Sequence, residues 1–129
     1  MKKILIEVSA GELLDKISIL HIKLDKIKDK NSLNFIKKEY DVLIQERDKN
    51  IHFNDEINNL YIELKTVNEK LWVIEDEKRL YEKNSKFDKE FIRVSRDIHF
   101  LNDKRAKIKL NINKILDSNI REIKQYTKY

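Results

Sequence analysis

The sequence predicts an all-α protein, an antiparallel bundle of three to four helices in which two long helices carry heptad patterns. The 129 residues include one glycine and no proline, whereas strand-rich folds need both residues at their many turns. Apolar residues also recur at alternating spacings of three and four along most of the chain, which is the period of one helix face. We expect a single domain over residues 1–129.

The first helix is expected over residues 10–29. Ser9 and Glu12 have the spacing of a capping box, in which the serine hydroxyl accepts from the backbone N–H of Glu12 and the carboxylate reaches back to the N–H of Ser9. An apolar stripe then follows at regular helical spacing. It consists of Leu13, Ile17, Leu20, Leu24 and Ile27.

A second helix is expected to begin at a cap formed by Asn31 or Ser32 and to end near Asp48. The connection after it is polar except for Ile51 and Phe53. We expect these two side chains to close one end of the bundle.

The third and fourth helices are the long ones. The third has an apolar stripe at Ile57, Leu60, Leu64, Val67, Leu71 and Ile74, and the fourth at Phe91, Val94, Ile98, Leu101, Ile108, Ile112 and Ile115. The third is expected to begin after Asn54 or Asp55, and the fourth to begin at Ser85 or Asp88 and to end near Asp117. Each would be about 42–45 Å long at 1.5 Å per residue. A 3.5-residue period predicts coiled-coil-like packing, and the short loop between the two helices requires them to be antiparallel.

The two ends of the chain lack the helical spacing of apolar residues. Residues 3–8 are rich in β-branched side chains, and residues 120–129 alternate apolar with polar side chains. This pattern is compatible with a short pair of strands between the N- and C-termini.

The composition of the chain argues against several classes of function. The net charge is +5, but 28 basic and 23 acidic residues are interleaved, which is typical of a solvated surface with ion pairs along its helices. The chain lacks cysteine, and its three histidines have no metal-ligand spacing, so we expect no metal and no cofactor. No apolar run is long enough for a membrane span or a signal peptide, and we expect a cytoplasmic protein.

Charged residues interrupt the apolar stripes at Lys78 and Arg105. In an antiparallel hairpin Asn68 would lie opposite Arg105, and Trp72 opposite Asn102. A buried guanidinium needs carboxylates or an anionic ligand. The candidate partners of Arg105 are Asp15 or Lys16 from the first helix, together with Asn68, Glu69, Asn102 and Lys109. An ion-pair layer that fixes the register of the helices is the simpler interpretation.

Three stretches carry a resemblance to a known family. They are Glu7-Val-Ser-Ala-Gly-Glu-Leu-Leu-Asp-Lys16, Leu71-Trp-Val-Ile-Glu-Asp76 with Arg79, and Asn102-Asp-Lys-Arg-Ala-Lys-Ile-Lys109. In these the chain resembles, over nearly its whole length, a family of uncharacterised bacterial and phage-borne proteins known only as a domain of unknown function. Typical members have Ala-Arg where this chain has Ser95-Arg96. The resemblance implies no activity, but it draws attention to the polar residues of the proposed layer. The candidate ligand-binding residues are Trp72, Glu75, Asp76, Arg79, Asn102, Asp103 and Arg105.

No motif identifies a reaction, so we expect a non-catalytic interaction or structural bundle that pairs with itself or with a protein partner through its helix faces. One alternative is a small anionic-ligand binder or enzyme, comparable to the all-helical chorismate mutases. Its cations would be Lys16, Arg79, Arg105 and Lys109, although the first helix has no arginine and nearby acids would neutralise the site.

A second alternative is a weak nucleic-acid binder. A solvated surface with ion pairs explains the charges more simply, because the basic residues are mostly Lys, whereas Arg is the better phosphate ligand. Nucleic-acid binding would require a single basic face formed by Lys37, Lys38, Lys104, Lys107 and Lys114.

Overall fold

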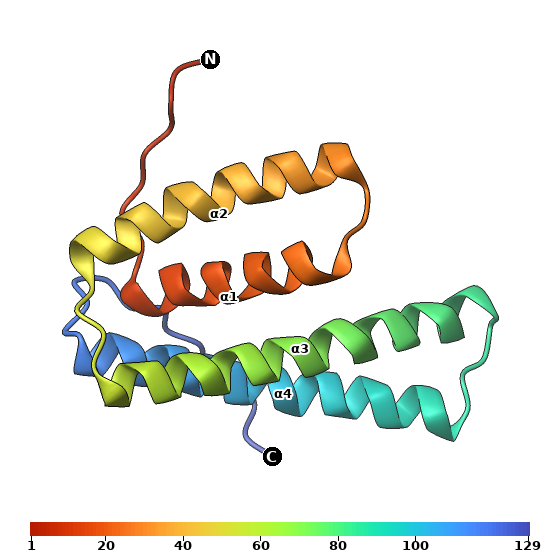
Figure 1. Ribbon diagram of the computed structural model, residues 1–129. Coiled ribbons are helices and arrows are strands. Elements are labelled where there is room, and N and C mark those ends of the chain that lie inside the picture. The colour runs from red at the N-terminus through yellow and green to blue at the C-terminus, as the bar shows by residue number, and fades with distance from the viewer.

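The computed structural model describes residues 1–129 and contains four helices and no strand. In chain order these are α1 (Ala10–Lys26), α2 (Lys30–Asn50), α3 (Asp55–Lys83) and α4 (Lys89–Ile115) (Figure 1). The prediction of an all-α protein with two long helices is confirmed. None of the four helices has the length and apolar character needed to cross a membrane.

The helices form two antiparallel hairpins (Figure 1). The short hairpin pairs α1 with α2, and the long hairpin pairs α3 with α4. α1 packs against both long helices, whereas α2 packs along α1 and contains no buried residue. α1 is therefore the central element of the fold, and any site in the interior must lie beside it.

Side-chain caps determine where the helices begin. Ser9, Asn54 and Asp88 cap α1, α3 and α4 as the sequence predicts. The predicted cap of α2 was wrong, because the Asp29 carboxylate, not Asn31 or Ser32, accepts from the backbone N–H and the hydroxyl of Ser32. α1 accordingly ends at Lys26, three residues before the predicted end.

The hydrophobic core lies where α1 covers the long hairpin. Its fully buried members include Leu14 and Ile17 of α1, Ile57 and Leu64 of α3, and Ile112 of α4. These are positions of the predicted stripes, apart from Leu14. Ile51 and Phe53 pack against the end of this core, so the expectation that they close the bundle is confirmed.

The long hairpin extends well beyond this core (Figure 1). α3 has 29 residues and α1 has 17, which correspond to about 43 Å and about 25 Å. Ile98 belongs to this core, and Val94 is the only buried apolar residue of the hairpin outside the core and towards its tip. Lys78, a predicted interruption of the stripe, lies in this outer part with its ammonium over the ring of Phe91 at 5.7 Å.

The predicted strand pair between the termini was wrong. Residues 1–9 and the segment after Asn119 have no regular secondary structure. A side-chain hydrogen bond of 2.6 Å, from Asn119 Nδ2 to Glu7 Oε2, joins the two ends of the chain. A two-stranded ribbon without further cover is marginal in water. Ile4, Leu5 and Ile6 are exposed, so no other part of the fold packs on this segment to stabilise such a ribbon.

Candidate functional site

An ion pair with a buried carboxylate and a partly exposed guanidinium joins α1 to α4 beside α3. Arg105 Nε donates to Asp15 Oδ1 at 2.9 Å, and Arg105 Nη2 donates to Asp15 Oδ2 at 2.5 Å. Asn68 Nδ2 donates to the same Oδ1 at 2.9 Å and to Ser18 Oγ at 2.8 Å. Asp15 is 1% exposed. The predicted proximity of Asn68 and Arg105 is confirmed, and a carboxylate from α1 joins them.

Lys109 extends this cluster towards the start of α1. Its Nζ lies 2.7 Å from Glu12 Oε2, 3.7 Å from Asp15 Oδ2 and 3.4 Å from Glu122 Oε2. Burial raises the pKa of the Asp15 carboxyl, but the hydrogen bonds from Arg105 and Asn68 and the charges of Arg105 and Lys109 outweigh it, so that the pKa is lowered. Asp15 is therefore a carboxylate at neutral pH.

The same contacts hold the two cations in their charged forms. The hydrogen bond to Asp15 raises the pKa of Arg105. Burial opposes the charge of Lys109, but its hydrogen bond to Glu12 and the surrounding carboxylates raise its pKa overall. Two of the four cations proposed for an anion site are thus engaged by carboxylates of the chain itself.

The first turn of α1 is fully hydrogen-bonded. The N–H of Ala10 donates to Ser118 Oγ at 3.1 Å, that of Gly11 to Asn113 Oδ1 at 2.7 Å, and that of Glu12 to Ser9 Oγ at 3.1 Å. These groups are the ones that a helix leaves without internal partners. Only half of the predicted capping box forms, because the Glu12 carboxylate pairs with Lys109.

Gly11 allows α1 and α4 to approach closely. A Cβ atom at this position would lie 2.5 Å from the backbone oxygen of Lys109 and 3.0 Å from Asn113 Oδ1. No other residue type fits without moving one helix. The only glycine of the chain thus marks the contact on which the buried cluster depends.

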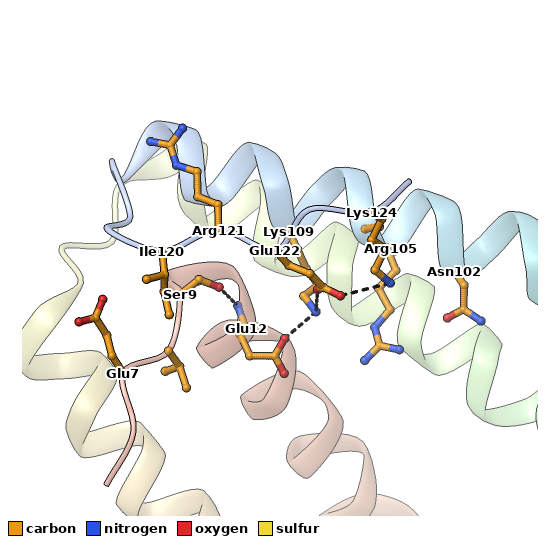
Figure 2. A pocket seen from close by; sticks show the side chains of 12 residues that line it. Glu7, Ser9, Glu12, Asn102, Arg105, Lys109, Ile120, Arg121, Glu122 and Lys124 are labelled. Carbon is orange, nitrogen blue, oxygen red and sulfur yellow. Dashed lines mark hydrogen bonds and ion pairs between the residues drawn. The ribbon is translucent and has the colours of Figure 1, made fainter. Parts of the chain in front are cut away.

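A pocket of about 550 Å³ lies where both chain ends meet α1 and α4 (Figure 2). Glu12, Lys109, Glu122 and Lys124 form a row of ion pairs across it, and Arg121 turns away from this row (Figure 2) to pair with Asp117 at 3.1 Å. The charged groups of this pocket are therefore largely neutralised by one another.

A second groove of about 550 Å³ lies on the other side of the buried ion pair, between α1 and the long hairpin. Arg105 and Asn102 border both hollows. The groove brings together six of the seven candidate ligand-binding residues: Trp72, Glu75, Asp76, Arg79, Asn102 and Arg105.

The seventh candidate lies elsewhere. Asp103 does not line the groove, and its carboxylate accepts a hydrogen bond from the hydroxyl of Tyr129. Tyr129 also stacks on His99, so Asp103 helps to hold the C-terminal segment against α4.

Sequence reasoning missed several members of the cluster. Ser18, Asn113 and Ser118 each hydrogen-bond a residue of another helix or of the first turn of α1. The sequence marks two positions of the contact between α1 and α4. Gly11 is the only glycine, and Asn113 is a polar residue directly after a residue of the apolar stripe of α4. Ser118 lies in the turn after α4 and is not marked in this way.

Comparison with known proteins places the chain within a family. No curated protein and no solved structure matches it. The sequence profile of a family of unknown function, DUF6165, matches residues 3–129, which include the termini, the buried cluster and both hollows. The chain therefore belongs to this family of unknown function.

Proposed function

We propose that the protein is a non-catalytic interaction module that pairs with a second copy of itself through the outer part of its long hairpin. We call residues 73–100 the distal hairpin. The observation that carries the proposal is the exposure of apolar side chains on this segment, which neither α1 nor α2 covers (Figure 1).

The exposed apolar residues of the distal hairpin recur along both of its helices. Val73 and Leu80, seven residues apart on α3, are 56% and 52% exposed. The other three are Phe87, Ile92 and Phe100. Single exposed apolar residues need no explanation, but a series along one projecting element indicates a surface that is covered in an assembly.

Charge supports a second copy as the partner. The distal hairpin carries seven basic and seven acidic residues, so its net charge is zero, whereas the whole chain carries +5. The excess positive charge therefore lies outside the segment. Two copies can approach there without net repulsion, and low net charge favours association.

Helix packing supports the same partner. Two helices alone bury little of their apolar surface, whereas two hairpins packed together form a four-helix bundle with a closed core. A two-fold axis would let the same patch serve on both copies. The ion pair between Glu77 and Arg93, at 3.1 Å, ties α3 to α4 and would keep the hairpin in register.

The two alternatives receive less support. The anion-binding alternative needs free cations, but two of its four, Arg105 and Lys109, are paired with Asp15 and Glu12. The nucleic-acid alternative needs one basic face, but its lysines lie on α2 and α4, two helices that do not contact each other.

Light scattering coupled to size-exclusion chromatography tests the proposal. The wild type should reach twice the chain mass of 15.7 kDa as its concentration rises. Leu80→Glu should remain monomeric, because a carboxylate would lie in the interface. Val42→Glu is the matched control, since Val42 is 53% exposed on α2, outside the distal hairpin, and it should dimerise like the wild type.

Two results would overturn the proposal. One is a wild type that stays monomeric at every concentration. The other is a dimer that Leu80→Glu and Val42→Glu weaken equally. Circular dichroism of both variants should match the wild type, because both positions are exposed.

A further inference from the structure

The groove between α1 and the long hairpin differs from the rest of the interior in one respect. In the buried cluster beside it, every charged group is paired. At its rim, Trp72, Glu75, Asp76, Arg79 and Asn102 make no side-chain hydrogen bond or ion pair at all. Five polar or aromatic groups thus line one hollow without partners in the chain, and three of them, Glu75, Asp76 and Arg79, are exposed.

The volume of the groove suits a small molecule. About 550 Å³ lies within the range of roughly 300–1,000 Å³ that is usual for ligand sites. Its apolar lining comes from Ile19 and Ile22 of α1 and from Leu71 of α3. An apolar floor with a few polar groups at the rim is the common composition of such sites.

The charges that line the groove indicate the charge of its ligand. Arg105 borders it, but Asp15 neutralises that guanidinium through two hydrogen bonds. The unpaired charges are then the two carboxylates Glu75 and Asp76 and the single cation Arg79. The unpaired groups have a net charge of −1, which favours a positively charged ligand over an anion.

Trp72 fits the same ligand. It is half-buried and lies one turn before Glu75 and Asp76 on α3. The face of an indole is the best aromatic partner for an organic cation. Carboxylates accept hydrogen bonds from an ammonium group, which has three donors and no acceptor.

We propose that this groove binds a small organic ammonium compound. The ammonium group lies against Trp72 and between Glu75 and Asp76. Trp72 and Arg79 each lie one residue, or about 100° around α3, from Val73 and Leu80, whereas Asp76 shares the face of these two apolar residues. The two proposals are tested separately, because pairing is measured by mass and ligand binding by the signals of Trp72.

Trp72 provides a direct readout, because it is the only tryptophan of the chain. The experiment titrates the protein with three four-carbon probes at constant ionic strength: 1,4-diaminobutane, 1,4-butanediol and succinate. Binding is followed by tryptophan fluorescence and by the indole N–H signal in proton–nitrogen NMR spectra. We expect a saturable response to the diamine and at least about tenfold weaker responses to the diol and to succinate.

Charge removal tests whether the response comes from the groove. The double variant Glu75→Gln with Asp76→Asn should weaken diamine binding by at least about tenfold. Glu82→Gln is the matched control, because Glu82 is an exposed, unpaired carboxylate on the same helix outside the groove, and it should bind like the wild type. The proposal is overturned if the diamine gives no saturable response, if succinate binds as tightly, or if the double variant binds as the wild type does.

Discussion

Arg105 of α4 and Asp15 of α1 form a two-pronged ion pair, and the carboxylate in the pair is 1% exposed. Asp15 also accepts from Asn68 of α3, so one buried carboxylate links three helices. Removing one member of a buried pair leaves the other charge without its partner, which costs far more than a surface pair contributes.

Arg105→Leu should therefore destabilise the fold. We expect a loss of about 2–4 kcal/mol in the free energy of unfolding, measured by urea denaturation, because Asp15 would keep only Asn68 and the more distant Lys109. Arg96→Leu is the control: Arg96 is exposed on the same helix without an ion pair, and its change should stay within about 0.5 kcal/mol. Equal effects of the two substitutions would show that the Arg105–Asp15 pair contributes little.

Gly11→Ala should also destabilise the fold, although helix propensity alone would predict a stabilisation. Alanine is favoured over glycine inside a helix by about 1 kcal/mol. The added Cβ would lie 2.5 Å from the backbone oxygen of Lys109, and relieving such overpacking costs about 1–3 kcal/mol. The expected net loss, measured by thermal unfolding, is up to about 2 kcal/mol.

A surface substitution calibrates the Gly11→Ala result. Asn59→Ala replaces an exposed residue of α3 and should be neutral or slightly stabilising through helix propensity. A Gly11→Ala protein as stable as the wild type would mean that α1 and α4 separate at low cost, and that the close approach does not hold the cluster together.

The local features of the fold could be predicted from the sequence, because they depend on neighbouring residues. Helix caps such as Ser9 and Asp88 act within three positions, and the apolar stripe of α3 repeats within each heptad. The strand pair was predicted wrongly for the same reason. The alternation of apolar and polar side chains in residues 3–8 is a property of that segment alone. It does not show whether a second strand lies beside it to form backbone hydrogen bonds.

The site was predictable only in part, because its contacts join distant segments. The hairpin geometry placed Trp72 near Asn102 and Asn68 near Arg105, and the structure brings these residues together. Gly11 and Asn113, by contrast, meet across 102 positions of the chain. Such a contact depends on the crossing of α1 over α4, which no heptad pattern specifies.

Asn113→Ala should weaken the start of α1. The side chain of Asn113 is buried, and its Oδ1 accepts from the N–H of Gly11 at 2.7 Å. Losing this acceptor leaves a buried N–H without a partner, at a cost of about 1–3 kcal/mol. Hydrogen exchange followed by NMR should show faster exchange of the Gly11 amide in the variant. Asn111→Ala, at an exposed position of the same helix, should leave that rate unchanged; acceleration in both variants would instead indicate general weakening of α4.

Acid should destabilise the protein in part through Asp15. The hydrogen bonds from Arg105 and Asn68 and the nearby cations lower the pKa of Asp15 in spite of its burial, whereas an unfolded aspartate has a pKa near 3.9. A group whose pKa is lower in the folded state contributes stability that is complete above the unfolded value and lost as the pH falls through the folded value. The contribution of Asp15 should therefore disappear below about pH 4.

Urea denaturation of Asp15→Asn across this pH interval measures the contribution. The variant should be less stable than the wild type at neutral pH, because Arg105 loses its partner, and its stability should fall less steeply below about pH 4 because it has one fewer carboxylate to protonate. Asp25→Asn, on the exposed side of the same helix, should follow the wild-type slope. If the Asp15→Asn and wild-type curves ran parallel through this interval, the lowered pKa of Asp15 would not contribute to stability, and the ion pair would act through packing and hydrogen-bond geometry alone.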